Sequence, residues 1–177
     1  MLMIRTEPVS PESKAYMVTL ETSPDHIRRL SPSNARSYAE AVLRAAAEAQ
    51  HDAQVFLQVK EMTDSTEEAA SMIVHLRQQR PPYNDKATRP LKFLPGVSEE
   101  GKPFLTVTDT STQEIQVNQM DVSNARQHAL VVLEAVRFAE LDTGYCRQLT
   151  NHVDIPIASA QGAVDDLPRF AWKAEGE

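Results

Sequence analysis

Several residue types are scarce in this chain of 177 residues, and each scarcity excludes a class of protein. Cys146 is the only cysteine, so the chain forms no intramolecular disulfide and offers no cysteine-rich zinc cluster. Only five residues are glycine, and none lies in a phosphate-binding loop or a dinucleotide fingerprint. No apolar run approaches the length of a membrane span, and the first residues lack the apolar region of a signal peptide. We therefore expect a cytoplasmic protein that does not contact a membrane.

Aromatic residues make up only 6% of the chain, whereas alanine is abundant in two segments. The core is therefore expected to consist mainly of Ala, Val, Leu and Ile. The formal net charge of −7 argues against non-specific binding of a polyanion over the whole surface, although it leaves room for a local basic patch.

Groups that would mark an enzyme are also missing from the sequence. The five histidines form no His-Glu-x-x-His pair, and no other histidine spacing places two ligands on one helical face. Cys146 has only Arg147 and His152 nearby to activate it, and it aligns with Phe56 in the repeat described next, which indicates a packing position. We expect no catalytic residue, no metal and no cofactor.

A segment of the chain recurs at a spacing of about ninety residues. The run Ser33-Asn34-Ala35-Arg36 returns as Ser123-Asn124-Ala125-Arg126, and the alanine, valine and leucine positions that follow keep the same register. Such a match over an extended register indicates an internal duplication rather than shared composition.

Both copies predict a helix. Ser31 and Asp121 are suitable N-cap residues, and Pro32 suits the first helical position. Apolar residues then follow at helical spacing. The second helix is more apolar overall, so it is the better candidate for deep burial or for a subunit contact. The apolar stripes comprise Ala35, Ala39, Val42, Leu43, Ala46 and Ala49 in one copy and Ala125, Ala129, Val132, Leu133, Val136 and Ala139 in the other.

Each helix is preceded by a predicted hairpin, at residues 16–30 in the first copy and 103–118 in the second. We therefore expect an α+β fold, in which two diverged β-β-α repeats form a pseudo-two-fold antiparallel sheet with helices packed on one face. A connecting helix is predicted after Ser65, which forms a capping box with Glu68. Residues 55–59 suit either a continuation of the first helix or a short strand.

The expected organisation has four parts. Residues 1–62 form the first repeat, and residues 63–102 form the connecting helix followed by a basic, proline-containing linker. Residues 103–154 form the second repeat, and residues 155–177 form an irregular tail. The two repeats are expected to make one compact domain.

The first helix and its hairpin resemble a unit in small uncharacterised proteins of high-GC bacteria and their phages, with the pattern Leu-Ser-Pro-x-x-Ala-Arg-x-x-Ala-x-x-Leu-Leu. Leu30, Ser31, Pro32, Ala35, Arg36, Ala39 and Leu43 match this pattern, whereas Asp121 and Val122 depart from it. The resemblance covers about a third of the chain and implies no activity.

Three groups of residues are candidates for binding a partner. The first is the basic stretch from 77 to 93, in which cations and aromatic rings alternate and which suits either a protein partner or a nucleic acid. The second is the tail, which either packs on its own sheet or anchors a partner. The third is the repeated arginine pair, which either grips an anion or serves the scaffold. The residues are Arg77, Arg80, Tyr83, Lys86, Arg89, Lys92 and Phe93, then Phe170 and Trp172, then Arg36 and Arg126.

These features favour a non-enzymatic accessory or regulatory protein that binds another protein. One alternative is a nucleic-acid-associated factor that uses residues 77–93. Another is an acidic DNA mimic, which fits the sign of the net charge but not the eighteen basic residues spread through the chain. A homodimer is left open.

Overall fold

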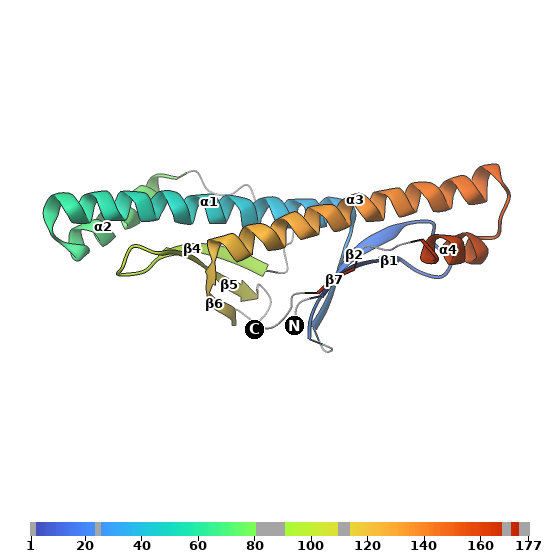
Figure 1. The fold of residues 1–177 in the computed structure, drawn as a ribbon, viewed down its shortest axis with the longest axis horizontal. Coiled ribbons are helices and arrows are strands. Elements are labelled where there is room, and N and C mark those ends of the chain that lie inside the picture. Colours follow the sequence, from blue (N-terminus) through green and yellow to red (C-terminus); the bar gives the residue numbers. More distant parts are fainter. Residues whose placement is uncertain (1–2, 24–25, 81–90, 110–113, 168–170, 174–177) are drawn as a thin grey trace. The chain divides into compact units, whose positions relative to one another are not determined.

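In the computed structural model of the chain, residues 3–23, 26–80, 91–109, 114–167 and 171–173 are described, and they form an α+β fold with two antiparallel sheets (Figure 1). This confirms the predicted fold class, including the packing of helices against sheets. The strands lie in two separate sheets, however, where the sequence suggested one.

The first sheet has the strand order β3-β2-β1-β7. Its strands are β1 (Met3–Pro8), β2 (Tyr16–Ser23), β3 (His26–Leu30) and β7 (Ala171–Lys173). The second sheet has the order β4-β5-β6, with β4 (Leu91–Val97), β5 (Pro103–Asp109) and β6 (Ile115–Asp121). All neighbouring strands in both sheets are antiparallel.

The helices are α1 (Pro32–Thr63), α2 (Thr66–Gln79), α3 (Val122–His152) and α4 (Ile157–Asp165). The two long helices begin where their caps predict. The backbone N–H of Asn34 donates to the Ser31 hydroxyl, and the N–H groups of Ser123 and Asn124 donate to the Asp121 carboxylate. Residues 55–59 continue α1 as helix.

The apolar stripes of both long helices are buried as predicted, and they are built largely of alanine. The fully buried positions are Ala35, Ala39, Val42, Ala46 and Ala49 on α1 and Ala125, Ala129, Val132, Val136 and Ala139 on α3. Leu43 and Leu133 are half-buried.

Each repeat has a strand that the sequence did not predict. In β1 only Ile4 is a buried apolar residue, and its neighbour Thr6 is buried although polar, so the alternation is weak. Strand β4 falls inside the segment expected to be a linker, and it contains Pro95 and Gly96, which usually argue against a strand. Both are tolerated because β4 is an edge strand. The Phe104 ring of β5 occupies the space where a Cβ on Gly96 would stand.

The tail prediction is corrected for residues 157–165, which form helix α4 rather than irregular chain. Buried Ala160 and Val164 pack one face of α4. The Gln161 side chain donates hydrogen bonds of 2.9 and 2.7 Å to the backbone carbonyls of Ser10 and Ser13. These acceptors are remote in the sequence, so local periodicity could not reveal this helix.

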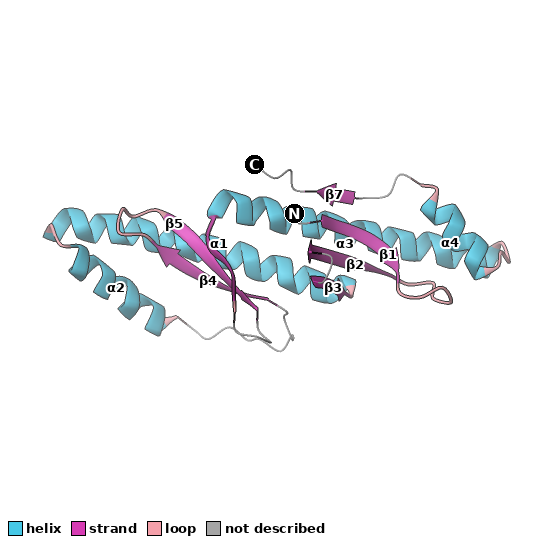
Figure 2. Cartoon of the chain, turned by 90° about the horizontal axis from the view of Figure 1, so that it is seen from below, coloured by secondary structure: helices cyan, strands magenta, loops and turns pink. Residues whose placement is uncertain are grey.

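The chain forms two compact units: unit 1 contains Met1–Ala39 and Ala129–Glu177, and unit 2 contains Glu40–His128. In unit 1, β1 and β2 lie along α3 (Figure 2), where the Thr6 hydroxyl donates to Asp142 at 3.1 Å and the Tyr16 N–H donates to Thr143 at 2.9 Å. In unit 2, β4 and β5 lie along α1, where Lys60 donates to the Glu99 carbonyl at 3.1 Å. The sheet of each repeat is thus covered by the long helix of the other repeat.

Candidate functional site

The two arginines at the start of the basic stretch are engaged with acidic residues. The Arg77 Nε donates to Asp52 at 2.8 Å, and the Arg80 guanidinium binds the other oxygen of the same carboxylate. Arg80 also lies 3.6 Å from Glu48. Asp52 is fully buried, so these contacts fasten the end of α2 to α1. Both guanidinium groups are therefore already paired with a carboxylate of the chain itself, which makes them less available to bind a ligand.

The remaining candidates of the basic stretch do not form one exposed surface among the described residues. Lys92 is exposed on β4, but the neighbouring Phe93 is buried in the core and cannot stack on a base. Tyr83, Lys86 and Arg89 lie outside the described residues. The prediction of a linker with an exposed aromatic residue at position 93 is therefore wrong, because β4 turns that side chain inward.

The tail candidates are placed only in part. The backbone of Trp172 belongs to β7 and is paired with Ile4 of β1, so this stretch of the tail adds a strand to its own sheet. Phe170 lies outside the described residues.

The repeated arginines bind equivalent positions of the two long helices. Arg36 donates to Glu140 at 2.8 Å, and Arg126 donates to Gln50 at 2.6 Å. Each arginine thus bridges the start of one long helix to the other long helix within its unit. These contacts support the scaffold interpretation of the pair.

Cys146, which was considered as a nucleophile, lies in the core, whereas Arg147 and His152 are exposed. Cys146 is fully buried, and burial raises the pKa of its thiol, which lowers the fraction of reactive thiolate. Within the described ranges no three His, Cys, Asp or Glu side chains come together in a group that could hold a metal ion. None of the helices in this part of the chain is both long and apolar enough to cross a membrane.

The exposed face of α2 is the most distinctive surface of unit 2. The helix begins at the predicted cap, where the Glu68 N–H donates to the Ser65 hydroxyl at 3.2 Å. Its opposite face is held in the core by Ala69 and Ile73, which pack against Phe56 of α1. Leu76 packs against the same core and Arg77 contacts Asp52. Among the exposed side chains of α2, two are large and apolar: Met72 is 41% exposed and Val74 is 55% exposed.

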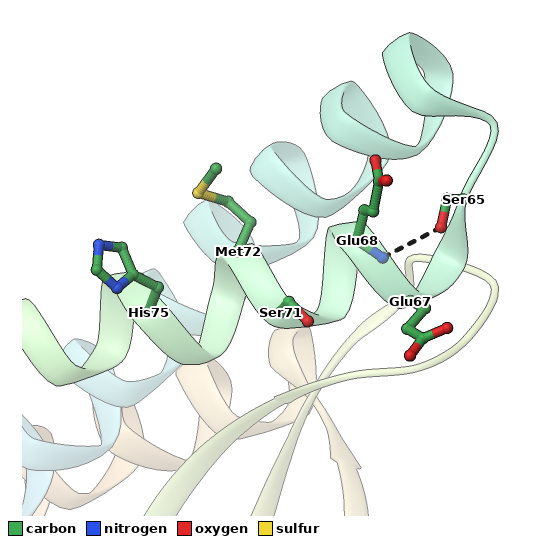
Figure 3. A pocket seen from close by; sticks show the side chains of 6 residues that line it. All are labelled: Ser65, Glu67, Glu68, Ser71, Met72 and His75. Carbon is green, nitrogen blue, oxygen red and sulfur yellow. Dashed lines mark hydrogen bonds between the residues drawn. The ribbon is translucent and has the colours of Figure 1, made fainter.

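Two shallow hollows run along this face, one on each side of the ridge made by Glu67, Ser71 and His75. The first has a volume of about 570 Å³ and is lined by Ser65, Glu67, Glu68, Ser71, Met72 and His75 (Figure 3). The second has a volume of about 460 Å³ and is lined by Glu67, Ala70, Ser71, Val74, His75 and Gln78. We call this surface the α2 face.

The chemistry of the α2 face suits docking better than catalysis. Ser71, a small exposed residue, lies between Met72 and Val74 around the helix, so a partner's backbone can approach closely there. The charged side chains that line the hollows are Glu67 and Glu68. His75, which lines both hollows, shares a hydrogen bond of 2.8 Å with Gln79.

Sequence reasoning did not single out this face. Met72 lies at the border of the buried stripe that contains Ala69 and Ile73. The signal that was available is Val74, an apolar residue that falls outside the stripe at helical spacing. Comparison with protein-family models, with curated proteins and with solved structures gives no match for this chain.

Proposed function

We propose that the chain is a cytoplasmic, non-enzymatic protein-interaction protein, and that its α2 face binds a basic amphipathic helix of another protein. The observation that carries the proposal is the pair of exposed apolar side chains, Met72 and Val74, beside hollows whose charged lining is acidic. A partner helix laid over these hollows uses apolar side chains for affinity and its flanking charges for orientation.

Charge complementarity decides the kind of partner. Glu67 and Glu68 are exposed at the start of α2, and no Lys or Arg is among the described residues that line either hollow. A partner with Lys or Arg on one flank would place its cations beside these carboxylates. Because the whole chain also carries a net charge of −7, long-range attraction would favour the same partner.

The anchoring of α2 supports the proposal because a rigid surface loses less conformational entropy on binding. One end of the helix is fixed by the Ser65 cap and the other by the contacts of Arg77 and Arg80 with Asp52. Between these ends, Ala69 and Ile73 are buried against Phe56.

The alternatives draw less support from the described residues. A nucleic-acid-associated factor would need the cations of residues 77–93, and two of these already bind Asp52. An acidic DNA mimic would use a broad acidic surface, whereas the α2 face combines two glutamates with apolar side chains.

The proposal is tested by site-specific photocrosslinking of the full chain in lysate of the source cells. A crosslinking amino acid replaces Met72 in one variant and Val74 in a second. A matched control places it at Gln54, which is exposed on α1 and lines neither hollow. We expect one protein to be captured at positions 72 and 74 but not at 54, through a peptide that is helical and basic.

The double substitution Glu67→Lys and Glu68→Lys should abolish that capture while the circular dichroism spectrum is retained. Capture of an acidic segment or of a nucleic acid would contradict the proposal, as would equal capture at all three positions or no capture at 72 and 74.

A further inference from the structure

The larger part of α3, which Figure 1 labels, belongs to unit 1 and carries a second exposed face. Leu130 and Leu141 are 55% and 57% exposed, although both belong to a helix whose other face is buried. Glu134 and Arg137 are exposed between them. The four positions are separated by four, three and four residues, so they form one stripe along the helix. We call them the α3 stripe.

The first repeat shows that the fold does not require these leucines. The equivalent positions of α1, aligned by the Ser-Asn-Ala-Arg match, are also exposed and carry no large apolar side chain. They are Glu40, Arg44, Ala47 and His51. The same scaffold thus tolerates a stripe without large apolar side chains at this place, whereas the second copy carries a leucine at each end of it. Leucines that stay more than half exposed, at positions where the fold accepts polar residues, indicate an external contact.

We propose that the α3 stripe binds the α3 stripe of a second copy of this chain, with the two helices antiparallel. In an isologous contact, residue i of one copy meets residue j of the other, and j meets i. Antiparallel pairing about the middle of the stripe places Leu130 opposite Leu141 and Glu134 opposite Arg137. Each of these contacts occurs twice, which gives two leucine pairs at the outside and two ion pairs at the centre.

The charges of the stripe are available for this pairing. Neither Glu134 nor Arg137 has an ion-pair partner in the described part of the chain, even though they are only three residues apart. The stripe carries one charge of each sign, so it attracts a second stripe that runs antiparallel to it. No other alignment of the two helices pairs all four side chains favourably. Because the surface is small, the dimer is expected to depend on concentration rather than to be permanent.

Sedimentation equilibrium of the full chain tests the dimer. We expect a reversible monomer–dimer equilibrium below about 1 mM, the weak end of the affinity scale. Leu130→Glu and Leu141→His install the residues of the first repeat, which the same fold accommodates. Each should weaken the dimer at least about tenfold, a change of about 1.4 kcal/mol. A monomer that persists at about 1 mM would overturn the proposal.

Charge reversal tests the antiparallel register. Glu134→Arg alone places two arginines together, and Arg137→Glu alone places two glutamates together, so each should weaken self-association. The double variant should restore it, and so should an equimolar mixture of the two single variants. If the dimer affinity does not change with these charge reversals, the α3 stripe is not the dimer interface. Unchanged circular dichroism spectra would show that the variants are folded.

Discussion

Asp52 is a carboxylate with no exposed surface, and it lies on α1 at a position where the helix faces α2. Burial of an ionised carboxylate is costly unless charge and hydrogen bonds compensate it. Arg77 and Arg80 supply both, and their own side chains are partly exposed at 36% and 24%. The equivalent residue of the second repeat, Asp142, is also buried, but there the Thr6 hydroxyl donates to it. One acidic position of the scaffold thus has two different partners.

Asp52→Asn should destabilise the protein by about 2 to 3 kcal/mol, because it leaves two arginines without their anion while partial exposure lets water solvate them. Urea unfolding measures this change in the free energy of unfolding. A double-mutant cycle with Arg77→Gln should give a coupling free energy of about 1 kcal/mol or more. If the two substitutions were additive, the Asp52–Arg77 contact would contribute nothing to stability.

His128 of α3 and Tyr38 of α1 are equivalent residues of the two repeats, and both are buried. Burial raises the pKa of the Tyr38 hydroxyl, so this side chain stays neutral. Burial also disfavours the imidazolium form of His128, whose pKa falls from 6.5 to about 4. The two positions share one requirement, which is a large side chain without charge.

The depressed pKa of His128 predicts a pH-dependent stability. The unfolded state binds the proton more tightly, so the stabilisation is complete above pH 6.5 and is lost as the pH falls toward about 4. The loss is at most about 3 kcal/mol. Urea midpoints measured at several pH values for wild type and His128→Phe would isolate this contribution from that of the carboxylates. Parallel curves for the two proteins would show that His128 does not titrate in this window.

At the scale of elements, α2 depends on its cap because a helix of 14 residues is marginal by itself. Ser65→Ala removes the acceptor of the Glu68 N–H and should cost about 1 kcal/mol. Ser71→Ala is a matched control, since Ser71 is exposed within the same helix and alanine has the higher helix propensity. Amide hydrogen exchange across α2 should accelerate in the first variant only. Equal effects of both substitutions would show that the cap does not hold the helix.

The elements that sequence reasoning recovered are those with strong local signals. The caps at Ser31, Ser65 and Asp121 and the apolar periodicity fixed the starts of α1, α2 and α3. Strand β4 and helix α4 were missed because their stability comes from partners elsewhere in the chain. Strand β4 exists through its pairing with β5, and α4 is held by Gln161 at the carbonyls of Ser10 and Ser13.

At the scale of the whole molecule, neither half of the chain contains a complete unit. Unit 1 needs β1 to β3 from the first half and the larger part of α3 from the second half. Unit 2 needs the larger part of α1 from the first half and β4 to β6 from the second. The contacts that join Thr6 to Asp142 and Lys60 to Glu99 therefore connect the two halves.

Because each unit contains segments from both halves of the chain, we expect the two halves to stay associated after the chain is cut between them. A protease site inserted between Gln79 and Leu91 of the full chain should give two fragments that still elute together in size-exclusion chromatography. They should separate only in denaturant, because each unit buries apolar surface contributed by both fragments. An identical cut inserted between Leu105 and Val107, inside a buried strand, should occur only after unfolding. If the fragments of the first variant separated under native conditions, the conclusion that each unit is built from both halves would be wrong.

The sequence by itself determined the α+β class, the caps and the buried faces of the long helices, because each follows from residues within a few turns of one another. It also showed the recurrence of its segments, which needs only a comparison of the chain with itself. It also identified the repeated arginines, but not their partners Glu140 and Gln50. Tertiary structure decided which helix covers which sheet, since both stripes are rich in alanine and either would fit either sheet. Tertiary structure also determined that Phe93 is buried and that Arg77 and Arg80 form ion pairs with Asp52. Val74 and Leu141 are exposed because no other element covers them. Exposure depends on what packs against a residue, and a local pattern does not contain that information.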